Sequence, residues 1–539
     1  MKKSSLKTES KRALALLLAL LFCVLVSGCR RGKDPKADPF ETAAPSPSPE
    51  ATEAPSQGGT LRLPIPVNAP YEDPLLVNTE EMLYLFSLVY DSLLTVDPSG
   101  EIQPCLCESW VGEGDGAWLL KLREGVKWHD GSGVIRSQEV LDTYNALILM
   151  EDSYYKHCLD HIVFMQAADT FSVRVKFDIP GIMGLYSLVF PIRKAGAPLI
   201  GTGAYRLEHR DDSRIKLTVN TEWWDKLPYV EKVVFEERDS NSTALASYEA
   251  GQLNFVPTDI LTAGRYSEAG VTSVYDVMTQ NMEVLLFNHV GSVFKDLDLR
   301  LAAAHGINRS RIITNVYSNR ARAADVPIPP DSWLYDSRSA VLNYDPDLSL
   351  RLIEEAGFTV QSKEGLRYSK DGRHLWIRLL TSATTENTVR SDAAAMIASQ
   401  LEQLGFKVEI TTAPHTLGDA ESEFLTALKA GNWDIALVGF NLGLNFDVTS
   451  YIDVNGANNF GNVCDWDLIE KAMYMAAAQT EEDLRDAAYD FQSYFVSTVP
   501  FMPLYFRLNS IICSSEIKGI EGAREPFLFF GEKNWHIEK

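Results

Sequence analysis

The chain has 539 residues, of which 45% are hydrophobic and 23% charged, and its formal net charge is −23 at pH 7. No basic patch interrupts this acidity, so the composition argues against a nucleic-acid partner. Single cores stop growing at about 250–300 residues, so a chain of this length is expected to form more than one lobe.

The first 29 residues have the pattern of an export signal. Basic residues precede an apolar run at 13–26, and small residues then lead to Cys29. The run is too short for a membrane helix, which needs about 20 residues, so a cleaved signal peptide is favoured. The segment Val26-Ser27-Gly28-Cys29 resembles the bacterial lipobox, which implies that Cys29 becomes lipidated. The alternative is ordinary secretion with an incidental cysteine.

The next segment is expected to be a tether. Residues 30–59 are rich in Pro, Ala, Ser, Thr and Glu and cannot bury enough apolar surface to offset their ordering entropy. We therefore predict a lipoprotein signal peptide at 1–28 and a disordered tether at 29–57. Two acyl chains suffice for stable anchoring, so the mature protein is expected on the outer face of the cytoplasmic membrane, held by lipid without crossing it.

Strand and helix patterns alternate through the rest of the chain. Apolar alternation predicts strands at 60–67, 118–122 and 171–177. Helical spacing appears at 80–87, 298–304, 348–356 and 393–404, and Gly357 and Gly405 end the last two. Further strands are expected at 375–380, 406–410 and 434–440, with a helix at 421–430 before the last. This interleaving predicts the α/β class.

A series of motifs carries a family resemblance. The most recognisable is LREGVKWHDG at 122–131. Two others precede it, at 90–94 and 104–110, and the rest come after it at 201–205, 220–224, 250–253, 287–302, 344–346, 355–358, 459–462 and 499–505. Over residues 57–520 the chain resembles the family 5 solute-binding proteins of ABC importers, the oligopeptide, dipeptide and nickel binding group. Each motif also has a structural interpretation, such as the Asp-Gly turn at 130–131, and we interpret the motifs as scaffold.

The resemblance implies a two-lobed periplasmic-binding-protein fold of type II, with mixed sheets, flanking helices, a hinge and an extra first-lobe subdomain. The expected segments are the lobe I core at 58–82, 194–281 and 502–539, the subdomain at 83–193, and lobe II at 282–501. It further implies a monomer that delivers a small solute or peptide to ABC permease subunits with their ATPase. A non-transport sensor or interaction lipoprotein with the same fold is the alternative.

The resemblance also places a ligand site. In peptide-binding relatives an aspartate after a second-lobe strand pairs with the α-ammonium of the peptide, and a gapless alignment puts that position on Leu444. A leucine cannot hold a cation, so a free-peptide ligand is in doubt unless Asp447 or another carboxylate replaces the anchor, or the alignment shifts locally. The candidate ligand-binding residues are Asn78, Thr79, Glu80, Phe440, Asn441, Leu442, Gly443, Leu444, Asp447, Tyr505 and Arg507.

No catalytic fingerprint appears, so neither an enzyme nor a cofactor is predicted. His157 and His161 are spaced so that a helix would place both on one face near Cys158 and Asp160, but no third ligand follows and surface histidines are favoured over a metal site. We assign no chemistry to the remaining cysteines, which are Cys105, Cys107, Cys158, Cys464 and Cys513.

Overall fold

The computed structural model describes residues 55–538, apart from positions 70, 78, 212, 339–340, 385–387 and 416–420. Of residues 268 and 269 only the backbone is described. All of these residues belong to one unit, Pro55–Lys539. The predicted signal peptide, Cys29 and nearly all of the predicted tether lie outside the described residues.

The first sheet joins the start of the described chain to a segment far along the sequence. In spatial order its strands are β1 (Thr60–Pro66), β10 (Lys232–Arg238), β9 (Arg214–Val219) and β8 (Tyr205–Arg210). β1 pairs with β10 in parallel, whereas the other pairs are antiparallel. Leu61, Leu63 and Ile65 of β1 are buried beside helix α2 (Glu80–Val89), so the strand and helix predicted here are confirmed.

A second, antiparallel sheet forms the next part of the chain. Its strands are β4 (Cys107–Gly114), β5 (Ala117–Leu122), β7 (Ser172–Phe177) and β6 (Ile162–Asp169). With it lie the hairpin β2 (Leu94–Val96) and β3 (Ile102–Pro104), helix α3 (Ser137–Ile148), and the 3-10 turns η2 (Tyr154–Leu159) and η3 (Ile182–Ser187). The boundary expected at residue 83 falls inside α2, whose buried side chains pack with the first sheet.

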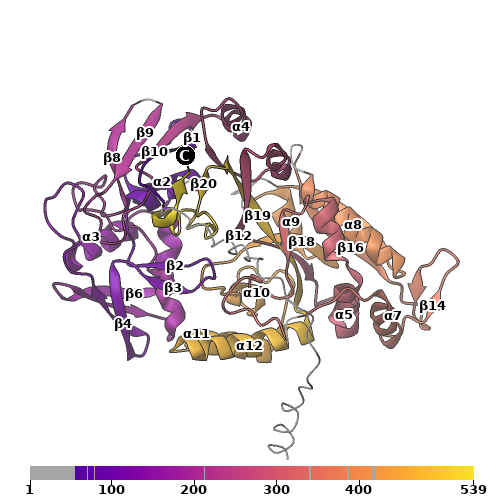
Figure 1. The fold of residues 1–539 in the computed structure, drawn as a ribbon. Coiled ribbons are helices and arrows are strands. Elements are labelled where there is room, and N and C mark those ends of the chain that lie inside the picture. Colours follow the sequence, from indigo (N-terminus) through magenta and orange to yellow (C-terminus); the bar gives the residue numbers. More distant parts are fainter. Residues whose placement is uncertain are drawn as a thin grey trace, which may run out of the picture. The chain divides into compact units, whose positions relative to one another are not determined.

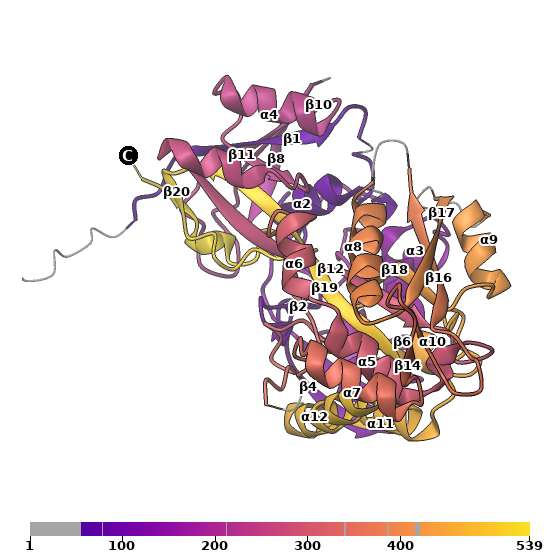
Figure 2. The same cartoon turned by 90° about the vertical axis from the view of Figure 1, so that its right-hand side faces the viewer.

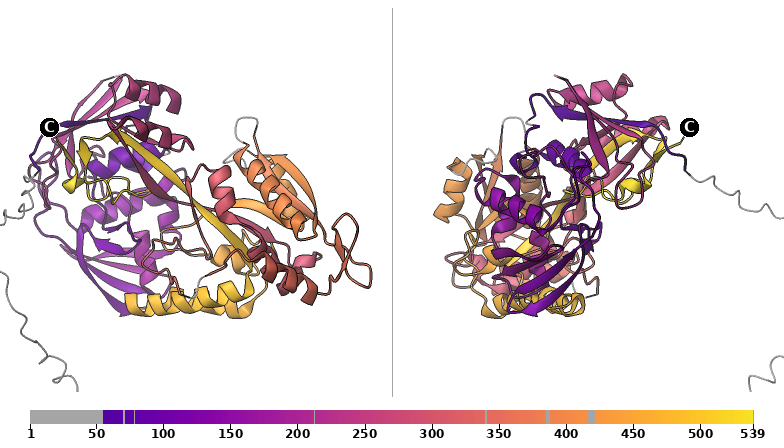
Figure 3. Two further views of the ribbon diagram at one scale, coloured as in Figure 1. Left: turned by 45° about the vertical axis from the view of Figure 1, so that its right-hand side comes forward. Right: turned by 90° about the vertical axis from the view of Figure 1, so that its left-hand side faces the viewer.

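The third sheet is the largest and contains two long strands. Its order is β11 (Phe255–Thr258), β19 (Phe501–Ser514), β12 (Thr272–Phe287), β18 (Ile435–Asn441), β16 (Trp376–Ala383) and β17 (Lys407–Pro414), with β13 (Ala321–Ala323) against β19. Figures 1 and 2 show β12 and β19 side by side, and the left view of Figure 3 follows β19 along its length. These strands run from the first sheet into the helix-covered second half.

Helices cover the second half of the third sheet. They are α5 (Leu297–Gly306), α6 (Arg309–Asn315), α7 (Pro346–Glu355), α8 (Val389–Gln403) and α9 (Glu423–Ala430), while α4 (Asn241–Glu249) lies near β11. Asp345 caps α7 by accepting the Leu348 N–H at 2.9 Å. Gly357 and Gly405 have φ of 93° and 98°, a left-handed conformation that glycine adopts without strain. The helices predicted at 298–304, 348–356, 393–404 and 421–430 are confirmed within a few residues.

The pairing of β12 with β19 has two register shifts near the middle of both strands, one between Met278 and Met282 and one between Glu283 and Val284. Met278 lies opposite Leu508 and Met282 opposite Phe506, so three residues of β12 face the single residue Arg507. Thr279 closes this bulge by donating its hydroxyl to the Arg507 carbonyl at 2.8 Å. A bulge bends its strand and raises the local twist. The lobe boundary expected at 281/282 falls at this irregularity.

Three of the sequence motifs meet at one buried carboxylate. Thr202 Oγ1 and Trp224 Nε1 each donate to Asp91 Oδ2 at 2.9 Å, so segments 90–94, 201–205 and 220–224 are held together. In the other half, Arg300 donates to the Phe294, Lys295, Thr498 and Val499 carbonyls. These motifs tie loops to one another, which supports their interpretation as scaffold.

Any side chain at position 201 is expected to destabilise the fold, because it would clash with neighbouring backbone. A Cβ at this position would lie 2.1 Å from the Val89 carbonyl oxygen, and backbone cannot move aside as a side chain can. We expect Gly201→Ala to lower the free energy of unfolding by about 1–3 kcal/mol. Gly112→Ala is the matched control, because its Cβ would approach Trp118 no closer than 3.6 Å. Urea unfolding of both variants measures this, and equal stabilities would contradict the expectation.

Candidate functional site

A cavity of about 890 Å³ lies where the first two sheets approach the third. Its lining comes from α2, from the loops at 90–105, 154–157 and 223–225, from the C-terminal segment 526–534, from Gln280 in the β12 bulge, and from Asn441, Gly443 and Leu444 after β18. The volume is within the range of about 300–1,000 Å³ that small-molecule sites occupy.

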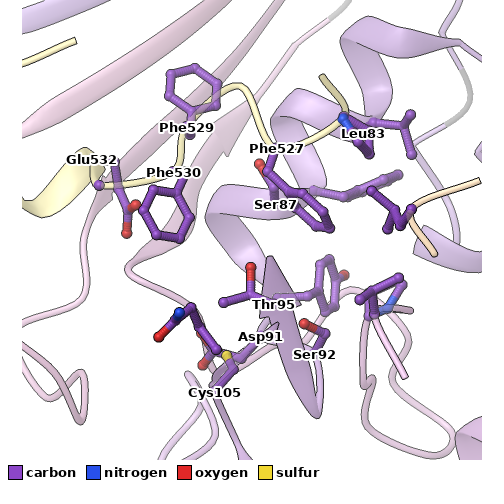
Figure 4. A pocket seen from close by; sticks show the side chains of 18 of the residues that line it. Leu83, Ser87, Asp91, Ser92, Thr95, Cys105, Phe527, Phe529, Phe530 and Glu532 are labelled. Carbon is purple, nitrogen blue, oxygen red and sulfur yellow. The ribbon is translucent and has the colours of Figure 1, made fainter. Parts of the chain in front are cut away.

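Aromatic side chains form much of the cavity wall. Figure 4 shows Phe527, Phe529 and Phe530 on the C-terminal segment, with Ser87 of α2 and Thr95 of β2 elsewhere on the wall. The other aromatic lining residues are Phe86, Tyr90, Tyr154, Tyr155, Trp223 and Trp224. Such a wall suits an apolar or aromatic ligand body, because aromatic rings supply a large contact area.

The two strongly basic side chains of the lining already have partners. The Arg123 guanidinium lies 4.5 Å from the centroid of the Trp224 ring, and its Nε donates to the Cys105 carbonyl at 2.7 Å. Lys533 forms an ion pair with Asp225. Burial opposes the ionisation of Asp225, but the hydrogen bond from Lys533 holds its pKa below the ordinary value. Lys533 and Asp225 neutralise each other, while Arg123 keeps its positive charge beside the Trp224 ring.

Two carboxyl groups of the lining have no such cation. Burial raises the pKa of Asp91, although the hydrogen bonds from Trp224 and Thr202 oppose the shift. Burial raises the pKa of Glu532 to about 7, and the nearby Asp91 charge adds to the effect. Within the described ranges no basic side chain forms an ion pair with either carboxyl group, since Lys533 turns to Asp225.

The segment predicted to form the second-lobe side of the site divides into two sets. Asn441, Gly443 and Leu444 line the cavity, and Leu444 is half-buried there. Phe440 and Leu442 turn into the core instead, where the Phe440 ring stacks on Tyr451 with centroids 3.8 Å apart. A role for these five residues in ligand binding stays a prediction.

Asp447, the proposed replacement anchor, lies outside the cavity lining. Its Oδ1 accepts the Thr449 N–H at 2.8 Å, at the start of the short helix α10 (Thr449–Ile452). The hydrogen bond that Asp447 accepts is therefore made within its own turn, away from the cavity.

The first-lobe residues predicted for the site lie at the start of α2. Thr79 caps the helix by accepting the Met82 N–H at 3.4 Å. Glu80 is exposed, and partial desolvation followed by the Glu81 charge raises the pKa of its carboxyl group. Neither lines the cavity, and Asn78 lies outside the described residues. Their ligand contacts remain predictions.

Tyr505 and Arg507, the remaining predicted site residues, lie on β19. The Tyr505 ring is fully buried, with its centroid 4.7 Å from that of Tyr317. Arg507 is half-buried, and its charge favours ionisation of Glu80 and Glu283. Glu283 is itself held by two hydrogen bonds of 2.9 Å from Arg390.

The comparisons with known proteins agree with this architecture. The model of the bacterial extracellular solute-binding proteins, family 5 Middle, matches residues 101–462. The chain belongs to this family. It is similar to the oligopeptide-binding protein AppA of Bacillus subtilis, with 24% identity over 97% of this chain and 99% of the relative. It is also similar to the nickel-binding periplasmic protein of Escherichia coli, with 22% identity over 84% of this chain and 90% of the relative.

Solved structures show the same fold. The murein tripeptide-binding protein MppA in an unliganded open form matches with a TM-score of 0.76 and 18% identity, over 90% of this chain and 98% of that chain. AppA of Bacillus subtilis in complex with a nonapeptide matches with a TM-score of 0.60 and 18% identity, over 90% and 100%. The predicted two-lobed periplasmic-binding-protein fold of type II is therefore confirmed.

Several lining residues of this family 5 protein were missed as site residues at the sequence level. Trp223 and Trp224 were recognised only as a motif, and Glu532 was not singled out. The three phenylalanines at 526–530 were a usable signal, because a cluster of apolar rings in a short segment indicates a binding or packing surface. Nothing in the sequence around Asp91 indicates that this residue lines a cavity.

The histidine pair does not have the geometry that its spacing suggested. His157 belongs to the 3-10 turn η2, which ends at Leu159, so four-residue spacing does not align the two rings. His157 Nδ1 lies 2.7 Å from the Tyr154 carbonyl oxygen, and His161 pairs with Asp178 at 2.9 Å. Among the described residues, no three His, Cys, Asp or Glu side chains gather to hold a metal.

Two further facts concern the described part of this family 5 protein. It contains no helix that is both long enough and apolar enough to cross a membrane. Its cysteines are free thiols, and burial raises the pKa of Cys107 to about 12.

Glu525, beside the cavity, should make stability depend on pH. Burial raises its pKa from an ordinary 4.5 to about 7, while it accepts the Tyr84 hydroxyl at 2.6 Å. The folded state therefore keeps this proton to higher pH than the unfolded state does. The associated stability is complete below pH 4.5 and is lost as pH rises through about 7, by about 3 kcal/mol.

Glu525→Gln should remove this component, because glutamine accepts the same hydroxyl and does not ionise. We expect the variant to gain stability relative to the wild type as pH rises from 5 to 8. Glu516→Gln, at an exposed site, is the control. Chemical unfolding across this pH range measures the difference, and parallel pH profiles for all three proteins would contradict the assignment.

Proposed function

We propose that this chain is the ligand-binding component of an ABC importer, which encloses a solute in the cavity and presents it to a membrane permease. The main support is that two different parts of the fold line the cavity. Most of the wall belongs to α2, to the segments at 90–105, 154–157 and 223–225, and to the C-terminal segment, whereas Asn441, Gly443 and Leu444 come from the end of β18, which pairs with β12 from Asn281 onward. Rotation about the β12–β19 bulge would open or close the cavity, so ligand binding would shift an open-closed equilibrium.

The ligand is proposed to be a compact solute. The cavity volume of about 890 Å³ suits a small molecule or short peptide. Leu444 supplies apolar contact on the second-lobe side, and Asp447, whose Oδ1 accepts a hydrogen bond within its own turn, does not line the cavity. These placements support a ligand whose charged group, if it has one, is held by the first-lobe side.

Retention of a native ligand tests this function. Native mass spectrometry of the purified mature protein should detect a bound solute that denaturation releases. Leu444→Trp should lose it, because the indole would occupy cavity volume. Leu149→Trp is the control, since Leu149 is 81% exposed and does not line the cavity. Equal ligand retention by both variants would refute the assignment of the cavity, and uptake unaffected by deletion of the protein would refute the importer role.

We further propose that Cys29 carries a lipid that holds the protein at the outer face of the cytoplasmic membrane. The support is the apolar run at 13–26 followed by Val26-Ser27-Gly28-Cys29. A lipid tether raises the effective concentration of the binding protein at its permease.

Cys29→Ala should release the protein from membranes, because the acyl chains would have no attachment site. Membrane fractionation with and without detergent, together with the intact mass of the wild-type protein, measures this. Ser27→Ala keeps the cysteine and a small residue and is the control. A Cys29→Ala protein that still needs detergent for extraction would contradict the anchor.

A further inference from the structure

We propose that the solute carries an organic cation, an ammonium or guanidinium group, which the Glu532 carboxylate binds at the Asp91 end of the cavity, and an apolar or aromatic body. This inference rests on the proposed function and names the chemical class of its ligand. Glu532 would then be the residue that selects for charge.

The position of Glu532 is the first argument. It begins the turn η6 (Glu532–Asn534) on the C-terminal segment and lines the cavity together with Phe530 and Gly531. Figure 4 shows its side chain beside the Phe530 ring, extending toward the side on which Asp91 and Cys105 lie. A ligand cation in contact with this carboxylate that also lay over the face of the Phe530 ring would be favoured further.

The distribution of charge is the second argument. Lys533 is paired with Asp225, and the Arg123 guanidinium is held against the Trp224 ring and the Cys105 carbonyl. No basic side chain forms an ion pair with Asp91 or Glu532 within the described ranges, and the Asp91 charge disfavours ionisation of Glu532 more than the Lys533 charge favours it. An ionised carboxylate in a partly desolvated cavity is unfavourable without a counter-charge. A ligand cation would supply that counter-charge.

The two carboxyl groups have different roles. Asp91 already accepts hydrogen bonds from Thr202 and Trp224, which fix its orientation, so it acts on the ligand through its charge. The Glu532 carboxylate accepts no hydrogen bond from another side chain within the described ranges, so it is free to accept hydrogen bonds from an ammonium. Glu532 is therefore the residue that contacts the ligand cation, and Asp91 adds a nearby negative charge.

An organic cation fits better than the other charged ligands. An anion would have to compete with Asp225 for Lys533, and it would be repelled by the Asp91 and Glu532 carboxylates. A metal ion would find no group of three suitable side chains among the described residues. The aromatic wall at Phe527, Phe529 and Phe530 favours a ligand with an apolar body.

The test compares charged and neutral probes of one shape. Calorimetric titration of the ligand-free protein with 2-phenylethylamine and with 2-phenylethanol isolates the charge. A second pair, the dipeptide amide Phe-Phe-NH2 and its N-acetyl derivative, distinguishes a peptide source of the ammonium from a non-peptide amine. We expect the cationic member of at least one pair to bind more tightly than its neutral analogue by about tenfold or more.

Variants then locate the charge effect. Glu532→Gln should weaken the cationic probe by about tenfold and leave the neutral probe unchanged, and Glu532→Asp should keep part of the preference. The exposed Glu516→Gln should behave like the wild type. Equal binding of charged and neutral probes, equal effects of Glu532→Gln on both, or failure of every probe to bind would overturn the inference.

The pH dependence gives an independent readout. Affinity for 2-phenylethylamine, which stays cationic over this range, should rise as pH increases from 6 to 8, because the pKa of Glu532 is raised to about 7. The other charged or titratable groups near Glu532 are Asp91, Cys105, Arg123, Tyr205, Asp225 and Lys533. The Glu532→Gln profile separates their contribution, and a rise that persists in this variant would overturn the assignment.

The mass of the released native ligand completes the experiment. A ligand with a basic nitrogen supports the inference, and a ligand without one overturns it while leaving the proposed binding function intact. The absence of any bound or transported solute would instead contradict the proposed function itself.

Discussion

The pairing of β12 with β19 is the constraint on which the rest of the structure depends. Both strands are long enough to belong to the first half of the fold at one end and to the helix-covered half at the other. β11 and β18 pair onto opposite outer edges of this ribbon, so the third sheet grows from it. The bulge at 279–281 interrupts the ladder where the cavity begins, at Gln280. The same strands thus build the sheet, connect the halves and position the site.

Local pattern was enough to predict many elements but not their partners. The strand at 60–67 and the helices at 348–356 and 393–404 were predicted because burial on one face leaves a regular spacing in the sequence. The parallel pairing of Thr60 with Lys232 depends on tertiary contacts that no local spacing encodes. The family resemblance supplied the two-lobed arrangement that periodicity could not.

The candidate site was predictable on one side only. The resemblance pointed to Leu444 and its neighbours, and three residues of that segment line the cavity. The other wall forms when the chain returns after β19 and brings Glu532 and Phe530 against Asp91, which is far away in sequence. Tyr505 lay in a plausible position along the chain, but its ring packs into the core. Tyr505 adjoins the register shift at which Glu283 faces Tyr505 and Val284 faces Pro503, and no local spacing in the sequence reveals that shift.

A second connection between the halves lies away from the long strands. The turn between α11 (Trp466–Ala477) and α12 (Glu481–Thr498) meets η3, where Ile182 N–H donates to the Ala478 carbonyl at 2.7 Å and Gln479 donates to the Pro180 carbonyl at 2.8 Å. Gly181 permits this approach, since a Cβ there would lie 2.3 Å from the Ala478 oxygen. Any rotation that separates η3 from this turn must break both hydrogen bonds. This second contact therefore opposes wide opening of the protein, because opening costs the free energy of both hydrogen bonds.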